Sequence, residues 1–374
     1  MRAQSIDSGE YPKLYFAFSI YISLALYNMM TTPILPAEAR IFYSPVHDIS
    51  TFATHIFYPL LPGAPGLRLP FFLISTINLF LYFRILGFFF DKSEDRIEAF
   101  FLYLFLPGVV ASFVLASSAP IAIFSVLAFY LSYRKGNITL QTLSLLPALF
   151  SDTASFSLYL AIFIYTYKKG DNKTAILSAV FLILSLLMGN YSFSGRPKGH
   201  LVELLGLYAA VFSPLLFIYY FYSLYRGWLE GRRDLLRCIA FVSLALSMLL
   251  SIRQKIHIID FSPYIIPGIF IALLQLHSSL RIRMRRYRKG YRVAASIVVG
   301  TMFLSSMLLL LHRPIYRLLG NPENFFLSSI YRPYDLAESL RRNGVGCYDP
   351  DRMEKKYHEI MRFYAIPECT ESKK

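Results

Sequence analysis

The sequence predicts an all-α protein that crosses a membrane many times. The chain has 374 residues, of which 55% are hydrophobic and only 16% are charged, and its mean hydropathy is +0.46. Apolar residues form long blocks, such as 14–35, 69–90 and 293–311, without the interruptions at period 3.6 or 2 that are typical of soluble domains. Because about 20 such residues cross the hydrocarbon core of a bilayer, we expect a polytopic membrane protein.

The apolar blocks can be placed in order along the chain. They predict 11 spans, near 14–35, 69–90, 97–117, 119–133, 138–150, 155–167, 174–189, 203–225, 236–251, 262–280 and 293–312. The segment 138–150 is short for a span, so 138–167 is either two spans or a re-entrant hairpin whose ends are covered by protein or water. Residues 1–312 thus form a membrane domain, with a long loop at 36–68.

Charge placement predicts the orientation. The formal net charge is +15, but the basic residues cluster in the loops 134–135, 168–173, 226–237 and 281–292. This is the pattern of cytoplasmic loops, whose cations also contact anionic lipid headgroups, and it argues against a nucleic-acid partner. No cleavable signal peptide is evident. We therefore predict a bacterial inner-membrane protein with a cytoplasmic N-terminus and a periplasmic C-terminus.

The last segment, 313–374, is polar and predicts a small α/β tail outside the membrane. Asp335 with Glu338 forms a capping box that opens a helix ending at Gly344. Residues 345–348 are predicted as a short strand. Asp351 with Glu354 forms a second capping box, and the helix after it carries an apolar face made by Met353, Tyr357, Ile360, Met361 and Tyr364.

The chain has three cysteines, one in the predicted membrane domain and two in the tail. Cys238 lies at the inner end of a predicted span and is interpreted as an inert buried thiol. Cys347 and Cys369 both lie in the tail, where an oxidising compartment would allow a disulfide between them. Their spacing fits neither a redox motif nor a zinc site. No cofactor is expected, and use of a divalent metal is left open without being indicated.

Chemistry is predicted at the outer face, where ionisable residues are few. Loop 36–68 offers Glu38, Arg40, His47, Asp48, His55 and Arg68; two further loops offer Arg196, Lys198, His200 and Glu203, and Arg253, Lys255, His257 and Asp260. Positive charge in outer loops opposes the topological bias, so these cations favour a phosphate partner. The predicted substrate-binding residues are Arg40, Arg68, Arg196, Lys198, Arg253, Lys255 and His257.

The predicted reaction is sugar transfer from a lipid phosphate. A carboxylate takes the proton from an acceptor hydroxyl as that hydroxyl attacks the anomeric carbon, and cations stabilise the departing phosphate. Glu38 is the best-placed base and Asp48 the second. The alternatives are that Glu38 and Arg40 form a solvated pair, that Arg253 and Lys255 only reach lipid headgroups, and that His257 and the other loop histidines are structural.

Four motifs resemble the C-type glycosyltransferase fold, in particular the bacterial relatives of protein O-mannosyltransferase and of the lipid A aminoarabinose transferase. They are Ala-Glu-Ala-Arg at 37–40, Gly-Leu-Arg-Leu-Pro at 66–70, Arg-Pro-Lys-Gly-His-Leu-Val-Glu-Leu-Leu at 196–205 running on to Phe-Ser-Pro-Leu-Leu-Phe at 212–217, and Lys255 to Pro267. The resemblance covers roughly residues 14–280. It implies a polyprenyl-phosphate sugar donor, Glu38 as the base, and Arg196, Lys198, Arg253 and Lys255 as phosphate contacts.

The chain also departs from that family. Ala37 stands where a paired acid is usual, Ser-Ser-Ala-Pro stands at 117–120 where an aspartate is frequent, and the large outer domain of many members is reduced to the tail. The leading hypothesis is a glycosyltransferase with a lipid, glycan or protein acceptor. The alternatives are a transporter or flippase for a lipid-linked or anionic substrate, and a non-catalytic envelope-assembly subunit. No internal repeat is seen, which argues against a transporter.

Overall fold

The computed structural model describes residues 11–43, 48–151, 153–188, 199–231, 234–282, 284–319, 328–343, 347–348 and 357–369. The helices of the main body are α1 (Tyr11–Thr31), α2 (Pro36–Tyr43), α3 (Ile49–Phe57), α4 (Ala64–Leu86), α5 (Ser93–Leu104), α6 (Pro107–Val114), α7 (Ala119–Lys135), α8 (Ile138–Leu149), α9 (Ser155–Lys169), α10 (Asn172–Leu187), α11 (Leu201–Phe212), α12 (Pro214–Leu229), α13 (Leu235–Ser251), α14 (Ile258–Ile265), the 3₁₀ turn η1 (Ile266–Gly268), α15 (Phe270–Ile282) and α16 (Arg285–Leu310). The tail adds α17 (His312–Leu319), α18 (Ser328–Arg342) and α19 (His358–Phe363).

The apolar helices are consistent with a protein embedded in a membrane, but not with 11 spans. Among the described residues, three segments are long and apolar enough to cross: α4, the continuous stretch Ile258–Ile282, and Arg286–Leu310. The number rises to 6 if each of three bent pairs counts as one span. The pairs α1–α2, α5–α6 and α11–α12 bend by 73°, 60° and 104°.

The prediction of 11 spans is therefore wrong, for a physical reason. Several predicted spans form helices that are too short for a bilayer, such as α8 with 12 residues and α9 with 15, whereas a perpendicular crossing takes about 20. Others break at a proline. Pro107 opens α6 and Pro214 opens α12, because proline supplies no amide proton to continue the preceding helix.

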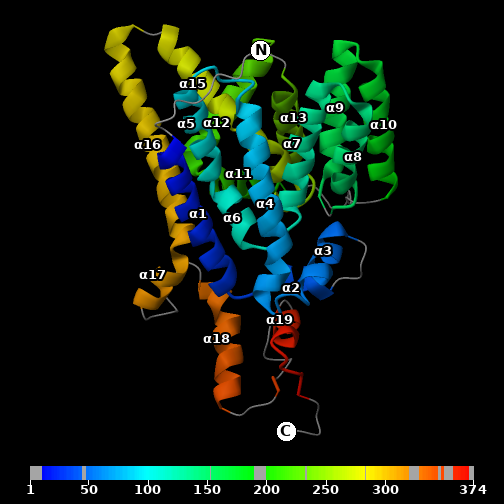
Figure 1. Ribbon diagram of the computed structural model, residues 1–374, viewed down its shortest axis with the longest axis vertical. Helices are drawn as coiled ribbons and strands as arrows, with labels where there is room; N and C mark the ends of the chain where they lie inside the picture. The colour runs from blue at the N-terminus through cyan, green and yellow to red at the C-terminus, as the bar shows by residue number, and fades with distance from the viewer. Residues whose placement is uncertain are drawn as a thin grey trace.

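The two ends of the bundle differ in character (Figure 1). The connections α4–α5 and α15–α16 lie at one end, while α2, α3 and the tail helices lie at the other. At the first end, adjoining cavities share residues and bring together Lys92, Arg134, Lys169, Arg237 and Arg281. We call the end with these cations the basic end, and the end with α2, α3 and the tail helices the tail end. The gathering of the basic loops at one end fits the charge pattern of the sequence.

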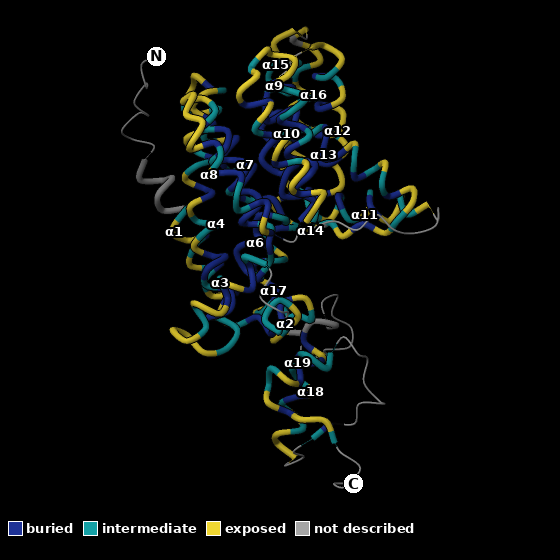
Figure 2. The backbone as a smooth tube through the Cα atoms, turned by 90° about the vertical axis from the view of Figure 1, so that its right-hand side faces the viewer, coloured by how far each residue is buried: buried dark blue, intermediate teal, exposed yellow. Residues whose placement is uncertain are grey.

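Polar contacts tie the apolar helices together inside the bundle. Ser157 of α9 bonds Ser243 of α13 at 3.1 Å, and Ser155 bonds Ser185 of α10 at 2.9 Å. All four serines are buried. Small hydroxyl side chains allow close helix approach and still satisfy their own hydrogen-bonding groups. Figure 2 shows the corresponding distribution, with buried backbone through the middle of the bundle and exposed backbone on its flanks.

The described part of the tail contains the helices α17, α18 and α19 and no strand, so the predicted α/β tail is wrong. Its one recorded pairing is an isolated bridge between Tyr348 and Glu368. Asp335 lies inside α18 and does not cap its start. The helix begins earlier, at Ser328. Its residues contact α17, because Tyr331 stacks on Tyr316 at 4.0 Å and the Tyr316 hydroxyl donates to Asp335 at 2.6 Å. The second capping box, at 351–354, lies outside the described residues.

A disulfide joins Cys347 to Cys369, with their Cα atoms 4.9 Å apart. Two backbone hydrogen bonds flank it: Tyr348 N donates to Pro367 O at 3.1 Å, and Cys369 N donates to Tyr348 O at 2.9 Å. The remaining cysteine, Cys238, is buried and reduced. The bond therefore closes a loop around α19.

Loss of this disulfide should loosen the tail. A loop of this length, 22 residues apart in sequence, corresponds to roughly 3 kcal/mol of chain entropy in the unfolded state. We expect Cys347→Ser to shorten the half-life of the tail under limited proteolysis several-fold. Cys238→Ser is the control and should leave that half-life unchanged. Equal half-lives for Cys347→Ser and the native chain would show that the bond contributes nothing to tail stability.

Candidate functional site

Two residues of the predicted site, Glu38 and Arg68, form a buried ion pair at the tail end. Glu38 lies in the first turn of α2, and Arg68 lies in the first turns of α4. Their side chains are 1% and 0% exposed. Arg68 Nε donates to Glu38 Oε1 at 2.7 Å, and Nη2 donates to Oε2 at 2.6 Å. This two-point geometry is the strong form of a charge-assisted hydrogen bond.

The rest of the Arg68 guanidinium is also committed. Nη1 donates to the carbonyls of Met29 at 3.0 Å and Thr32 at 2.7 Å, and Nη2 donates to that of Pro33 at 2.8 Å. An arginine offers five N–H donors, and all five are used here. These carbonyls lie at and just after the end of α1, where a helix leaves its last carbonyls without intrahelical partners. Arg68 therefore binds the end of α1 as well as Glu38.

The Glu38 carboxylate is equally saturated. Besides Arg68, it accepts from Leu35 N at 2.9 Å and from Ala116 N at 2.7 Å, so each oxygen receives two hydrogen bonds. The pair thus connects α1, α2 and α4 to the segment that follows α6. A general base needs an accessible lone pair within hydrogen-bond reach of its substrate. Glu38 as the base, and Arg68 as a substrate contact, stay predictions that require this pair to open first.

The tail lies directly against α2. Ile360 is 0% exposed and packs in a cluster with Ile34, Ala39, Leu67 and Phe71. The amide of Ile34 donates to the Tyr364 hydroxyl at 3.3 Å. The packing extends over three aromatic rings, with Phe363 lying 5.8 Å from Phe42 and 6.3 Å from Tyr58. Helix α19 therefore covers the segment that carries Glu38.

Asp48 has a different environment. It is half-buried and precedes α3, whose first amides it does not cap with its side chain. The neighbouring amide of Ile49 donates to Phe150 O at 3.0 Å, and Ala154 N donates to Asp260 O at 3.2 Å. The connection between α8 and α9 therefore contacts both the first predicted outer loop and the last. The charge pattern of the sequence predicts these loops at one face, but it does not predict this connection between them.

The same connection is held by buried hydroxyls. Thr153 bonds Ser151 at 2.8 Å and the Tyr264 hydroxyl at 2.7 Å. Tyr264 lies in the Ser-Pro-Tyr-Ile-Ile-Pro motif, and all three residues are buried. A buried hydroxyl network is rigid when each of its hydroxyls has a hydrogen-bond partner. The hydroxyls of Ser151, Thr153 and Tyr264 all have one, so the network fixes α14 against the α8–α9 connection. Asp152 lies outside the described residues.

The predicted phosphate-binding cations are only partly gathered. Lys255 is exposed and pairs with Glu203 at 2.5 Å, and His200 lies 3.3 Å from the same carboxylate. Arg253 and His257 are exposed on the same connection between α13 and α14. Arg40 and His55 are exposed on α2 and α3. His47, Arg196 and Lys198 lie outside the described residues.

The basic end carries a second polar site, which the sequence did not predict. A cavity of about 730 Å³ is lined there by charged residues from α5, α13 and α15 or their flanks, Asp91, Lys92, Asp95, Asp234, Arg237, His277 and Arg281. Burial raises the pKa of the Asp234 carboxyl above its ordinary value, although the Leu236 amide and Arg237 oppose that rise. A possible signal was the Asp95-x-x-Glu98 spacing, which puts both acids on one face of a helix.

Comparison of the chain with protein-family models, with curated proteins and with solved structures finds no match.

Proposed function

We propose that this chain is a membrane glycosyltransferase that moves a sugar from a polyprenyl-phosphate donor to an acceptor at the tail end. The observation that carries the proposal is the contact of three chain segments around residues 150–154, with Asp48 at one side and Asp260 at the other. Asp260 lies in the Lys255 to Pro267 motif, and Asp48 is the second candidate base that the sequence predicts in loop 36–68. The apolar helices provide the setting in which a lipid-linked donor is bound.

The proposed chemistry needs one carboxylate and a phosphate site. Asp48 takes the proton from the acceptor hydroxyl while that oxygen attacks the anomeric carbon. The bond from the anomeric carbon to the phosphate oxygen breaks, and Arg253 and Lys255 stabilise the departing anion. Glu38 and Arg68 act as positioning residues, because they hold α2, the helix that precedes Asp48 in the chain. Direct attack inverts the configuration at the sugar.

A second candidate, a non-catalytic envelope-assembly subunit, is favoured by one observation. Both oxygens of Glu38 are fully bonded to protein groups, and Ala37 stands beside it where the resembled family usually has a second acid. A chain with the ion pair and without the second acid has the structural contact but lacks one reactive group. This is the combination expected of a non-catalytic subunit.

Mass spectrometry of envelope glycans and glycolipids tests the proposal. We expect deletion of the gene and Asp48→Asn both to accumulate a species lighter by one sugar, because the amide cannot take up the proton. Glu94→Gln, an exposed acid at the basic end, is the matched control and should give the native products. All strains are compared at equal protein level. Native products from Asp48→Asn, together with a change in the deletion strain, would favour the assembly subunit.

A further inference from the structure

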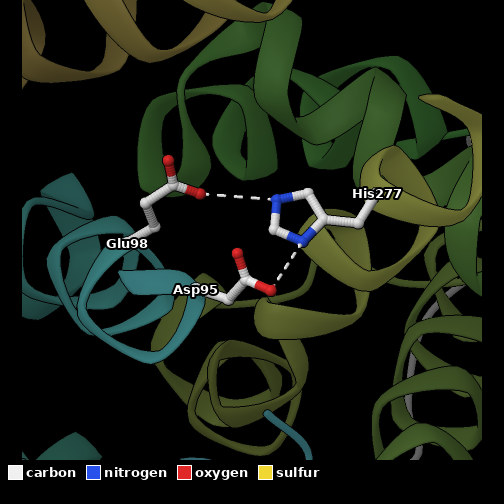
Figure 3. A group of neighbouring side chains, drawn as sticks. All are labelled: Asp95, Glu98 and His277. Carbon is white, nitrogen blue, oxygen red and sulfur yellow. Dashed lines mark ion pairs between the residues drawn. The ribbon is translucent and has the colours of Figure 1, made fainter. Parts of the chain in front are cut away.

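At the basic end, two carboxylates from one helix converge on a histidine from another (Figure 3). Asp95 and Glu98 lie one turn apart on α5, and His277 lies on α15. Asp95 Oδ2 is 3.6 Å from His277 Nδ1, and Glu98 Oε2 is 3.4 Å from Nε2. The candidate ligand atoms of the three residues all lie within 4.8 Å of one another.

We infer that Asp95, Glu98 and His277 bind a divalent transition-metal ion, of the class to which Mn²⁺ and Zn²⁺ belong. One imidazole and two carboxylates are a donor set that these ions accept. Two ligand atoms on opposite sides of such an ion, each at about 2.0–2.2 Å, are separated by roughly 4.0–4.4 Å. The two carboxylates face different nitrogens of the His277 ring, so a rotamer change of one carboxylate or of the ring is needed to bring all three ligand atoms around one ion.

The cluster lies at the wall of a cavity. Asp95 and His277 both line it, and its volume is about 730 Å³. Three protein ligands leave coordination positions open, and a cavity of this size has room for the waters that fill them. His277 and Asp95 are 23% and 25% exposed, and Glu98 is 61% exposed. An ion can thus enter from the solvent side without unfolding of the helices.

The histidine is also held in place. Phe90 lies edge-on to the His277 ring at 6.5 Å, and α5 packs against α15. Sites built on rigid helices hold their ligands more accurately than sites on loops. The two carboxylates balance the charge of one divalent ion, although Lys92 and Arg281, the latter on the same helix as His277, also line the cavity and oppose a cation. A bound ion would join α5 to α15, two helices far apart in the sequence, at the opposite end from the site of the proposed transferase.

Manganese binding by the purified full-length chain tests this inference. The protein is stripped with a chelator and titrated with Mn²⁺ under electron paramagnetic resonance. We expect one Mn²⁺ per chain, with nitrogen hyperfine coupling from one imidazole and displacement by Zn²⁺. We expect Asp95→Asn and His277→Gln to weaken binding at least tenfold, and His277→Gln also to abolish the nitrogen coupling. Glu94→Gln, on the same helix turn and outside the cluster, should bind as the native chain does.

Three outcomes would overturn the inference. The first is the absence of Mn²⁺ and Zn²⁺ binding by the native chain. The second is binding of unchanged strength in both Asp95→Asn and His277→Gln. The third is a bound Mn²⁺ signal without nitrogen coupling, which decides the matter on the native chain even where a variant fails to fold. Because Asp48 lies at the other end of the bundle, sugar transfer and metal binding can fail independently of each other.

Discussion

Substitution of Arg68 by methionine should lower the free energy of unfolding by about 3–5 kcal/mol, the range measured when one partner of a buried ion pair is removed. The guanidinium is fully buried and donates five hydrogen bonds. Its loss leaves the Glu38 carboxylate charged in an apolar environment and the carbonyls at the end of α1 without donors. Chemical unfolding in mixed micelles, followed by far-ultraviolet circular dichroism, measures the loss.

Three further variants separate the ion pair from other effects. Glu38→Gln should also destabilise the chain, because an amide cannot accept four hydrogen bonds. The double variant should lose less than the sum of the two single variants, since the second substitution removes a group already unpaired. Arg40→Met changes an exposed arginine on α2, the helix that carries Glu38. It should change the free energy of unfolding by no more than about 0.5 kcal/mol. Native stability in a Glu38→Gln variant that transfers no sugar would restore Glu38 as the base.

The helical content of the chain was predictable from its apolar blocks, but the number of spans was not. A block such as 138–150 shows that a segment is buried from water, and it does not show whether the segment crosses a bilayer. Its helix, α8, packs against α7 and contains Pro147 in its last turn. By contrast, Pro107 and Pro214 mark breaks that the sequence displays. The angle at each break depends on packing against distant helices, which no local pattern encodes.

The candidate site was also predictable only in part from the sequence. Glu38 and Arg68 were both predicted from the sequence as separate reactive groups. In the structure they bond to each other, so each must be released before it can perform its own predicted task. The hydrogen bonds that occupy these two side chains come partly from backbone groups, such as the Thr32 carbonyl and the Ala116 amide. The sequence does not indicate which backbone groups a side chain will meet. Asp95 and His277 were passed over because charges at the basic end were interpreted only as determinants of topology.

The second large effect is expected at the contact between the tail and α2. Ile360→Ala should remove about 2–5 kcal/mol of docking free energy, the range for truncation of a buried isoleucine. Ile360 is 0% exposed, and its partners Ile34, Ala39 and Leu67 belong to the segments that carry the ion pair. Hydrogen exchange measured by mass spectrometry should show faster exchange of the α19 and α2 amides. Leu336 lies in α18 and is 40% exposed. Leu336→Ala should leave the exchange rates of the α19 and α2 amides unchanged.

The same measurement distinguishes two roles for the tail. If α19 only rests on a finished structure, Ile360→Ala will speed exchange in α19 and leave α2 as slow as in the native chain. If the tail instead helps to keep the ion pair closed, the Leu35 amide, which donates to Glu38, will exchange faster as well. The second result would mean that undocking of the tail precedes opening of the pair, and that Glu38 reaches solvent only in that state. Faster α19 exchange with no change in α2 would contradict our expectation and leave the closed pair independent of the tail.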